Sequence, residues 1–413
     1  MLTNIRIWIK DHRNKMVNSI AFYPAIIAIA FLVLSLLSIA FDFSEKGMEI
    51  KSHLQALKLR DASTARSIIS SITAGIITLT VFSFSMVMIV LNQTASQLSN
   101  RILEKLIGSR FQQVVLGIYV GTIVYALFLL TVIRDIDSGV QIPALSTYLL
   151  ILLTIVDIFL FIFFLHYITQ SVKYEVIIHR IFKETKSSME HSCKLQQPPA
   201  EALLFKSECL ITAANSGIYQ GFDQQILIGI CNDNDCILYM MQSPGTFILQ
   251  GLPVIKVNKT LPDEIIKKIQ KEVYLQTSES INENYFFGMQ QLTELALKAL
   301  SPGINDPGTA IQSLRALFQL YAYRVNHFPK NTIKNKETQI RIILRQLTFE
   351  QIFEATIFPI WDYGKNDRLM QHEIEHFLTM LFSLNQNTSI AQLLNEVKLK
   401  MLEKEHKIKE NPV

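Results

Sequence analysis

The sequence predicts an α-helical membrane protein with four transmembrane helices and a cytoplasmic α+β region, in which a small β-barrel-like module precedes a helical domain. Two observations support this fold class. Hydrophobic residues make up 49% of the 413 residues and the mean hydropathy is positive, but the apolar residues gather in four blocks before residue 170. A helix needs about 20 apolar residues to cross the hydrocarbon core of a bilayer, and the blocks reach that length. After residue 170 the composition is that of an ordinary soluble domain.

The four apolar blocks and the segment before them define a membrane region. The predicted spans cover about residues 20–41, 67–91, 114–133 and 145–169, within a transmembrane domain at 20–170. Residues 1–19 are basic and mildly amphipathic, which is typical of a segment that lies in the lipid interface. The first block is long for a signal peptide and three more blocks follow it, so we expect an uncleaved anchor.

The distribution of lysine and arginine predicts the orientation of the spans. The amino end carries four such residues, the second connection three, and residues 173–194 five, whereas the third connection carries one. Cytoplasmic loops are enriched in these residues, although the first connection, with five, opposes the trend. We therefore expect a multi-pass protein of the bacterial plasma (inner) membrane, with both termini and residues 171–413 in the cytoplasm.

The second span carries a row of small polar residues. They recur at four- and seven-residue steps, which places them on one side of a helix: Ser67, Ser71, Thr78, Ser85 and Asn92. Isoleucine, leucine and valine occupy much of the remainder, so we expect the helix to present hydrocarbon to lipid. The polar side then faces either neighbouring helices or water. The first alternative makes it structural and the second makes it the lining of a pathway.

Asp157 lies near the centre of the fourth span, between apolar residues. A carboxylate at that depth costs several kcal/mol unless it is neutral, paired or hydrated. The functional interpretation is an ion or proton relay, or a cation site. The structural interpretation is an aspartate that hydrogen-bonds to a neighbouring helix, with the hydroxyl residues of the second span as available partners.

The third span contains a GxxxG motif, formed by Gly117 and Gly121. Two glycines at this spacing let two helix backbones approach closely. Together with the polar side of the second span, the motif suggests that copies of the chain assemble into a homo-oligomer.

The soluble part is predicted to contain three segments: a helical connector and linker at 171–206, a β-module at 207–258, and an α-helical domain at 259–413. Glycines punctuate short runs of β-branched and aromatic residues in the β-module. Its end, Ser243–Val257, is similar to the paired-turn hairpin of lipoyl-type hybrid barrels, without an attachment lysine. Helical periodicity predicts helices at 262–276, 285–300, 307–325, 336–355, 367–384 and 388–408.

Two groups of residues contain side chains that can bind metal ions, but each is a weak candidate for a metal site. His372, Glu373 and His376 match the H-E-x-x-H pattern of zinc hydrolases, but no third ligand follows, and the pattern fits a solvated helix face better. Cys231 and Cys236 lack a second pair, which favours reduced thiols beside a turn. We expect no metal site and no cofactor, and we do not expect an enzyme.

The most distinctive soluble stretch is the turn that contains Ser301, Asn305, Asp306 and Thr309. Ser301 can end one helix, and Asn305 or Asp306 can cap the next, with a proline in the first turn. A helix start also favours anions, and these oxygen atoms could instead hold a cation. The sequence leaves open whether this turn meets a ligand.

Several stretches together resemble one known family. They are Arg101, the run Leu116–Tyr125, the hairpin Pro244–Pro253, Phe287–Leu292 and Ala299–Ala310. They resemble a bacterial family of predicted membrane proteins, domain of unknown function 2254, over nearly the whole chain. Members more often have an aromatic residue in place of Gly308 and usually no aspartate in place of Asp157. The resemblance implies a membrane architecture, and the family carries no established activity.

Three functions remain as hypotheses. The first is a homo-oligomeric ion channel or transport protein in which the second span lines the path, Asp157 lies beside it, and the cytoplasmic part regulates. The second is a non-conducting sensor or scaffold that binds a ligand or protein near residues 301–309. The third is a membrane-bound metallohydrolase that uses His372, Glu373 and His376. The net charge of +4 and the absence of basic blocks indicate no nucleic-acid partner, so the expected partners are the bilayer, a second copy, and a small ion or ligand.

Overall fold

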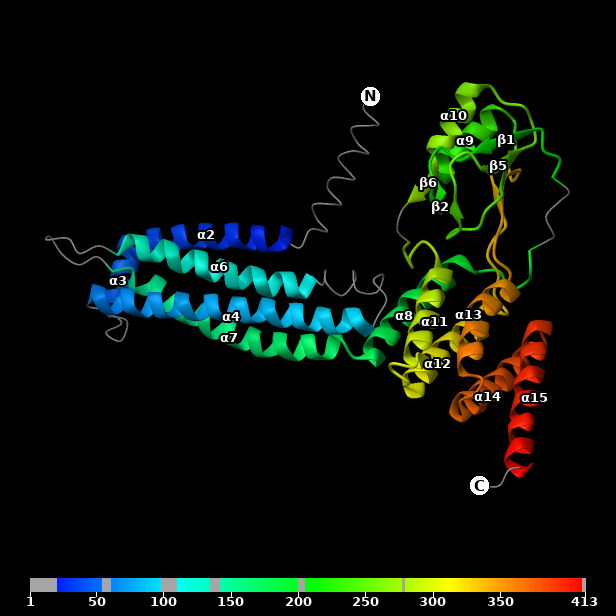
Figure 1. Cartoon of the computed structure of the whole chain (residues 1–413). Coiled ribbons are helices and arrows are strands. Elements are labelled where there is room, and N and C mark those ends of the chain that lie inside the picture. Colours follow the sequence, from blue (N-terminus) through cyan, green and yellow to red (C-terminus); the bar gives the residue numbers. More distant parts are fainter. Residues whose placement is uncertain are drawn as a thin grey trace. The chain divides into compact units, whose positions relative to one another are not determined.

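The computed structural model describes residues 21–53, 61–97, 110–133, 142–199, 205–276 and 279–410. The chain divides into two compact units, Met1–Lys173 and Tyr174–Val413 (Figure 1). The predicted interfacial segment at 1–19 and the stretch around Arg101 lie outside the described residues.

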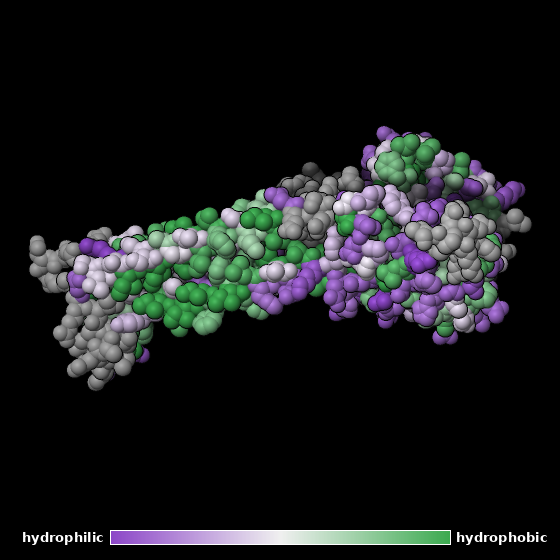
Figure 2. All heavy atoms as spheres, turned by 60° about the horizontal axis from the view of Figure 1, so that its bottom comes forward, coloured by the Kyte–Doolittle hydropathy of each residue, from purple (hydrophilic) through white to green (hydrophobic). Residues whose placement is uncertain are grey.

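The first unit is a bundle of long helices. They are α2 (Phe22–Asp42), the short α3 (Glu45–His53), α4 (Ala62–Gln97), α6 (Arg110–Val132) and α7 (Ala144–Ser171). Four of them, α2, α4, α6 and α7, are long and apolar enough to cross a membrane, which confirms the four predicted spans to within a few residues, except at the start of the second. Hydrophobic side chains cover the outside of this bundle and appear as green surface in Figure 2.

Helix α6 lies at the centre of the bundle, because it packs against α2, α4 and α7. One apolar cluster gathers around Tyr125 and Leu129 of α6, and a second gathers around Tyr119 of the same helix with Ile76 and Phe164. Nine of the 23 residues of α6 are buried. Because α6 has neighbours on several sides, polar residues in its middle, such as Tyr119, Thr122 and Tyr125, face protein rather than lipid.

The second unit combines helices with two sheets. Its helices are α8 (Tyr174–Ser192), α9 (Gln224–Asp233), α10 (Asp263–Lys271), α11 (Tyr285–Leu300), α12 (Pro307–Arg324), α13 (Phe349–Gly364), α14 (Arg368–Leu384) and α15 (Thr388–Glu410). Side-chain caps start several of them: Asp223, Asn284, Asp306, Thr348 and Asp367 each accept a hydrogen bond from a first-turn backbone N–H.

Helix α8, which we expected to be a connector, belongs to the core of the second unit. It packs against α11 and α12. At the contact with α11, a Cβ added to Gly288 would overlap Thr185 Oγ1, so the two helices can approach this closely only with glycine at that position. The Phe287–Gly288 pair of the family resemblance therefore has a packing role here.

The sheets differ from the predicted barrel-like module. A five-stranded sheet has the order β1-β5-β3-β8-β7, and a three-stranded sheet has the order β4-β2-β6. The strands are β1 (Cys209–Thr212), β2 (Gly217–Phe222), β3 (Leu238–Met240), β4 (Phe247–Ile248), β5 (Pro253–Val257), β6 (Val273–Gln276), β7 (Thr332–Lys334) and β8 (Ile340–Leu344). The described strands form two open sheets and no closed barrel, so the barrel-like prediction is not supported.

Three strands come from the region that was predicted to be helical throughout. Strand β8 pairs in parallel with β3, which places residues 340–344 beside 238–240, and the predicted helix at 336–355 is wrong over its first part. A second predicted helix, 262–276, ends at Lys271, and its last residues pair with β2 as β6. These strands are short, and their apolar residues fit helical and extended spacing equally well, so only the long-range partner decides.

Candidate functional site

Five small polar residues of α4 face away from the bundle. Ser67, Ser71, Thr78, Ser85 and Asn92 are exposed in the single chain. We call these five residues the outer stripe. Thr78 donates its hydroxyl hydrogen to the carbonyl of Ala74, one turn earlier, at 2.9 Å, so it needs no partner on another helix.

The opposite side of α4 is the one that packs inside the chain. Ala65, Ile69 and Ile76 are buried there, and two hydroxyl residues, Thr73 and Ser83, are buried with them. We had expected the isoleucine side of this helix to face lipid, and that expectation is wrong for Ile69 and Ile76. The physical reason is that close-packed aliphatic side chains fill the interface with α6 and α7, which leaves the outer stripe for the exterior.

The GxxxG motif has a partner within the chain. A Cβ added to Gly117 would lie 2.7 Å from Ile27 Cδ1, and one added to Gly121 would lie 2.7 Å from Phe31 Cγ. Both contacts are with α2. The close approach that the motif permits therefore occurs between α2 and α6 of one chain, and the motif does not support assembly of copies.

Asp157 lies on the inner side of α7, away from the outer stripe. Thirteen residues of α7 precede it and fourteen follow, so it lies about 20 Å from either end of the helix. The Thr122 hydroxyl faces its carboxyl group, and the Tyr119 hydroxyl lies nearby and faces Ser83. We call these four residues the buried polar cluster; three helices, α4, α6 and α7, contribute to it.

The buried polar cluster is poorly satisfied, because its side chains form only two loose pairs, Thr122 with Asp157 and Ser83 with Tyr119. Asp157, Tyr119 and Thr122 have no exposed surface and Ser83 has 3%. Both carboxyl oxygens of Asp157 and the three hydroxyl oxygens make no hydrogen bond of normal geometry with the described residues. Leaving a buried polar group without a partner costs about 1–3 kcal/mol, and a charged group costs more.

A narrow cavity of about 160 Å³ reaches this cluster. Ser83 and Tyr119 line one part of it, and Gln112 and Gln113, in the first turn of α6, line another. Its other walls are apolar side chains of α4, α6 and α7. The cavity thus extends from the cluster toward the N-terminal end of α6.

The turn at 301–309 uses its own polar groups. Asp306 caps α12: its Oδ1 accepts from the Thr309 N–H at 3.1 Å and its Oδ2 from the Thr309 hydroxyl at 2.6 Å. Ser301 Oγ donates to the Lys298 carbonyl at 2.7 Å and closes the end of α11. Asn305 has a φ of 49°, in the left-handed region that asparagine tolerates better than most residues. The capping role predicted for Asp306 is confirmed, and this geometry leaves its oxygens engaged.

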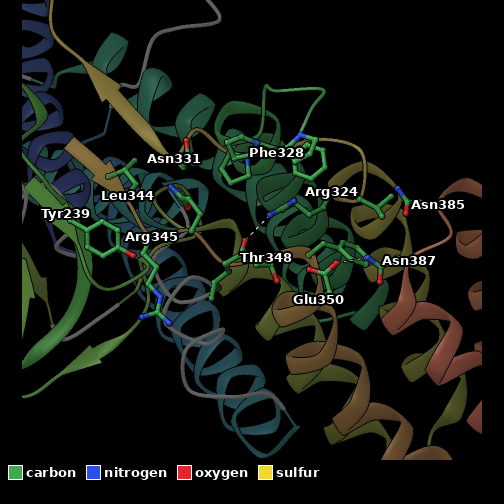
Figure 3. A pocket seen from close by; sticks show the side chains of 17 residues that line it. Tyr239, Arg324, Phe328, Asn331, Leu344, Arg345, Thr348, Glu350, Asn385 and Asn387 are labelled. Atoms are coloured by element: carbon green, nitrogen blue, oxygen red, sulfur yellow. Dashed lines mark hydrogen bonds between the residues drawn. The ribbon is translucent and has the colours of Figure 1, made fainter. Parts of the chain in front are cut away.

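A polar cavity of the second unit lies elsewhere, around Arg324. It has a volume of about 620 Å³, and Figure 3 shows its lining side chains. Arg324 is buried, and its three nitrogens donate to Tyr285 Oη, the His327 carbonyl and the Leu347 carbonyl at 2.9–3.1 Å. All three acceptors are neutral, so the guanidinium charge is not balanced by an ion pair with any of them.

The other charged residues of this cavity are Arg345 and Glu350. Burial opposes ionisation of Glu350, but hydrogen bonds from its own backbone, Asn387 and Thr348, and the nearby Arg324, hold the pKa of this carboxyl below its ordinary value. With Glu350 ionised and two guanidiniums present, the cavity keeps an excess of one positive charge. Its aromatic and proline side chains add apolar walls, so it suits an organic anion of modest size.

The H-E-x-x-H residues lie on α14 and do not form a metal site. His372 and His376 are exposed, and Glu373 lies 3.8 Å from Arg315 in an ion pair. Among the residues that the structure describes, no group of three or more histidine, cysteine, aspartate or glutamate side chains is placed to hold a metal ion. Cys231 and Cys236 are buried free thiols next to the turn at Asp235.

The sequence identified Asp157 and offered the hydroxyl residues of the second span as its partners, but it did not single out Ser83, Tyr119 or Thr122. Ser83 does not belong to the outer stripe. Tyr119 lies between the two glycines of the GxxxG motif and Thr122 follows the second glycine, so apolar residues surround both of them in the sequence. A signal was present, since a tyrosine and a threonine one turn apart on a central span are themselves unusual in hydrocarbon. Arg324 gave no signal, because an arginine at the end of an amphipathic helix is ordinary.

Comparison with known proteins agrees with this architecture. The family described as a predicted membrane protein, domain of unknown function 2254, matches residues 17–380. Two uncharacterized proteins, one from Mycobacterium bovis and one from Mycobacterium tuberculosis, are each 24% identical over 344 residues, which cover 78% of this chain. The chain spans 64% of the length of these relatives, and no solved structure matches it. Because the family match extends over most of the chain, the protein belongs to the domain of unknown function 2254 family of predicted membrane proteins.

Proposed function

We propose that the protein is a homo-oligomeric ion channel or transport protein of the bacterial plasma membrane, and that the outer stripes of several copies of α4 line its path. The observation that supports this proposal is the outward orientation of the stripe. The exposed sides of α2 and α7 carry large apolar residues such as Leu37 and Phe159, as lipid contact requires. The exposed side of α4 also carries large apolar residues such as Val81 and Ile89, but the outer stripe adds small hydroxyl and amide groups among them, which suit close contact with another helix or with water.

The second unit serves as the regulatory part in this proposal. The cavity around Arg324 has the volume and the mixed polar and apolar lining of a small-molecule site, so a cytoplasmic anion could bind there. The same cavity supports the second candidate function, a sensor that binds its ligand without conducting ions. In that case the ligand site is the cavity at Arg324 rather than the turn at 301–309, whose polar groups are engaged in capping.

Cysteine labelling in liposomes tests the proposal. Ser71→Cys places a thiol on the outer stripe, Thr73→Cys places one on the inner side of the same helix, and Phe159→Cys places one on the exposed apolar side of α7. We expect a membrane-impermeant, water-soluble thiol reagent to modify only Ser71→Cys, and that modification to change ion flux. The unmodified chain, with its native cysteines, gives the background.

The possible outcomes separate the candidate functions. Labelling of Ser71→Cys together with altered flux supports a hydrated path. Oxidative cross-linking between copies at Ser71→Cys, without labelling or flux, overturns the path and favours the sensor. Labelling that is equal at positions 71, 73 and 159, or absent at 71 with no cross-link, overturns both the path and the assembly through α4.

A further inference from the structure

The buried polar cluster is separate from the outer stripe. Ser83 and the stripe residue Ser85 lie on opposite sides of α4, one buried and the other exposed. A role in a path along the outer stripe would therefore not explain why Asp157, Tyr119, Thr122 and Ser83 are gathered inside the bundle. Their polar atoms are all oxygens, and all lack partners of normal hydrogen-bond geometry among the described residues.

We infer that the buried polar cluster is a binding site for a small monovalent metal cation of the Na⁺ class, held within each copy of the chain. Hard cations prefer carboxylate and hydroxyl oxygens, and the cluster supplies only these. The three hydroxyl hydrogens and a proton on Asp157 could join these oxygens into a chain of hydrogen bonds, but the two pairs are too loose for normal hydrogen-bond geometry. A coordinated cation accepts lone pairs from the carboxylate of α7 and from hydroxyls of α4 and α6 at the same time.

The charge of the cluster sets the charge of the ion. Asp157 is the one carboxylate in it, so a monovalent cation gives a neutral site in hydrocarbon, whereas a divalent cation would leave a buried positive charge. Tyr119 is the ionisable group that faces Asp157 from α6. The other ionisable groups nearby belong to a different cluster, where Asp42 accepts hydrogen bonds from Lys51 and Ser146 and Tyr125 bonds to Ser38.

The cavity of about 160 Å³ offers a route to the site. The cavity extends from Gln112 and Gln113 to Ser83 and Tyr119, which are two members of the cluster. The first turn of α6 is the end that we expect to face the cytoplasm, so the ion would enter from that side. Amide groups along the entrance can replace water around a passing cation more readily than aliphatic walls can.

Sodium binding to the full chain in lipid nanodiscs tests this inference. We expect saturable binding of radioactive Na⁺ with one ion per chain, and a rise of the unfolding midpoint in NaCl relative to choline chloride at the same ionic strength. Asp157→Asn should abolish both effects. Thr122→Val and Ser83→Ala should each weaken the apparent Na⁺ affinity about tenfold, which corresponds to about 1.4 kcal/mol.

A matched control and a second measurement keep the test decisive. Ser70→Ala removes an exposed hydroxyl of α4 that belongs to neither the outer stripe nor the buried polar cluster, and it should leave Na⁺ affinity unchanged. If a variant fails to fold, infrared difference spectra of the unmodified chain still report Asp157: we expect a carboxylate with Na⁺ and a carboxylic acid in choline. Absence of saturable Na⁺ binding, a carboxylic acid that persists in Na⁺, or an equal loss in Ser70→Ala would overturn the inference. Because binding is measured without flux, failure of the proposed path leaves this result unaffected.

Discussion

Gly121 gives a prediction that separates packing inside the chain from assembly between chains. A Cβ at this position would lie 2.7, 2.8 and 3.1 Å from three ring atoms of Phe31, whereas ordinary contact begins near 3.4 Å. In Gly121→Ala, either the Phe31 ring must turn or α2 and α6 must move apart. Overpacking of this kind costs about 1–3 kcal/mol, so the unfolding equilibrium constant should rise about 5- to 150-fold.

Gly75 provides the matched control for this prediction. It lies on the exposed side of α4, and a Cβ there would meet nothing within 4 Å. Gly75→Ala therefore reports only the helix preference for alanine, a gain of at most about 1 kcal/mol. The difference between the two variants isolates the clash with Phe31. Adding Phe31→Leu to Gly121→Ala should recover part of the loss, because the two side chains share one space.

The assay is equilibrium unfolding in mixed micelles, with the mass of the folded particle measured by light scattering. We expect Gly121→Ala to lower stability while the folded fraction keeps the oligomeric state of the unmodified protein. Gly121→Ala that is as stable as Gly75→Ala would refute the close contact with α2. A smaller particle at unchanged stability would show that the GxxxG motif joins copies instead.

Two further predictions concern the second unit. Asp306→Ala should destabilise the chain by about 1 kcal/mol through loss of the α12 cap, and Asp306→Asn should recover most of that loss, as thermal unfolding can measure; an unchanged midpoint in Asp306→Ala would contradict the capping role. Thr356→Val should cost about 1–3 kcal/mol, because the Thr356 hydroxyl already donates to Ile352 and is the acceptor for the buried Tyr321 hydroxyl at 2.5 Å. Thr356→Val combined with Tyr321→Phe should be more stable than Thr356→Val alone, and a further loss would show that Tyr321 has another partner.

Hydropathy determined the membrane architecture before any contact was known. The positions of the four spans, the helices at 285–300, 307–325, 367–384 and 388–408, and the Asp306 cap all follow from local rules: apolar length, helical periodicity and side-chain capping. These features depend on residues close together in the chain. A sequence contains them directly, because no distant partner is needed to stabilise them.

Tertiary structure decided the features that depend on distant partners. Residues 340–344 are a strand because β3, about a hundred residues earlier, pairs with them. The outer stripe of α4 faces outward because α6 and α7 cover the other side of the helix, and Gly121 meets Phe31 because α2 packs there. Asp157 was visible in the sequence, but Ser83, Tyr119 and Thr122 became a cluster with it only when three helices packed together. The local sequence pattern determines which residues form a helix. Which face of that helix is buried depends on the neighbouring helices, because the packing that buries the most apolar surface is favoured.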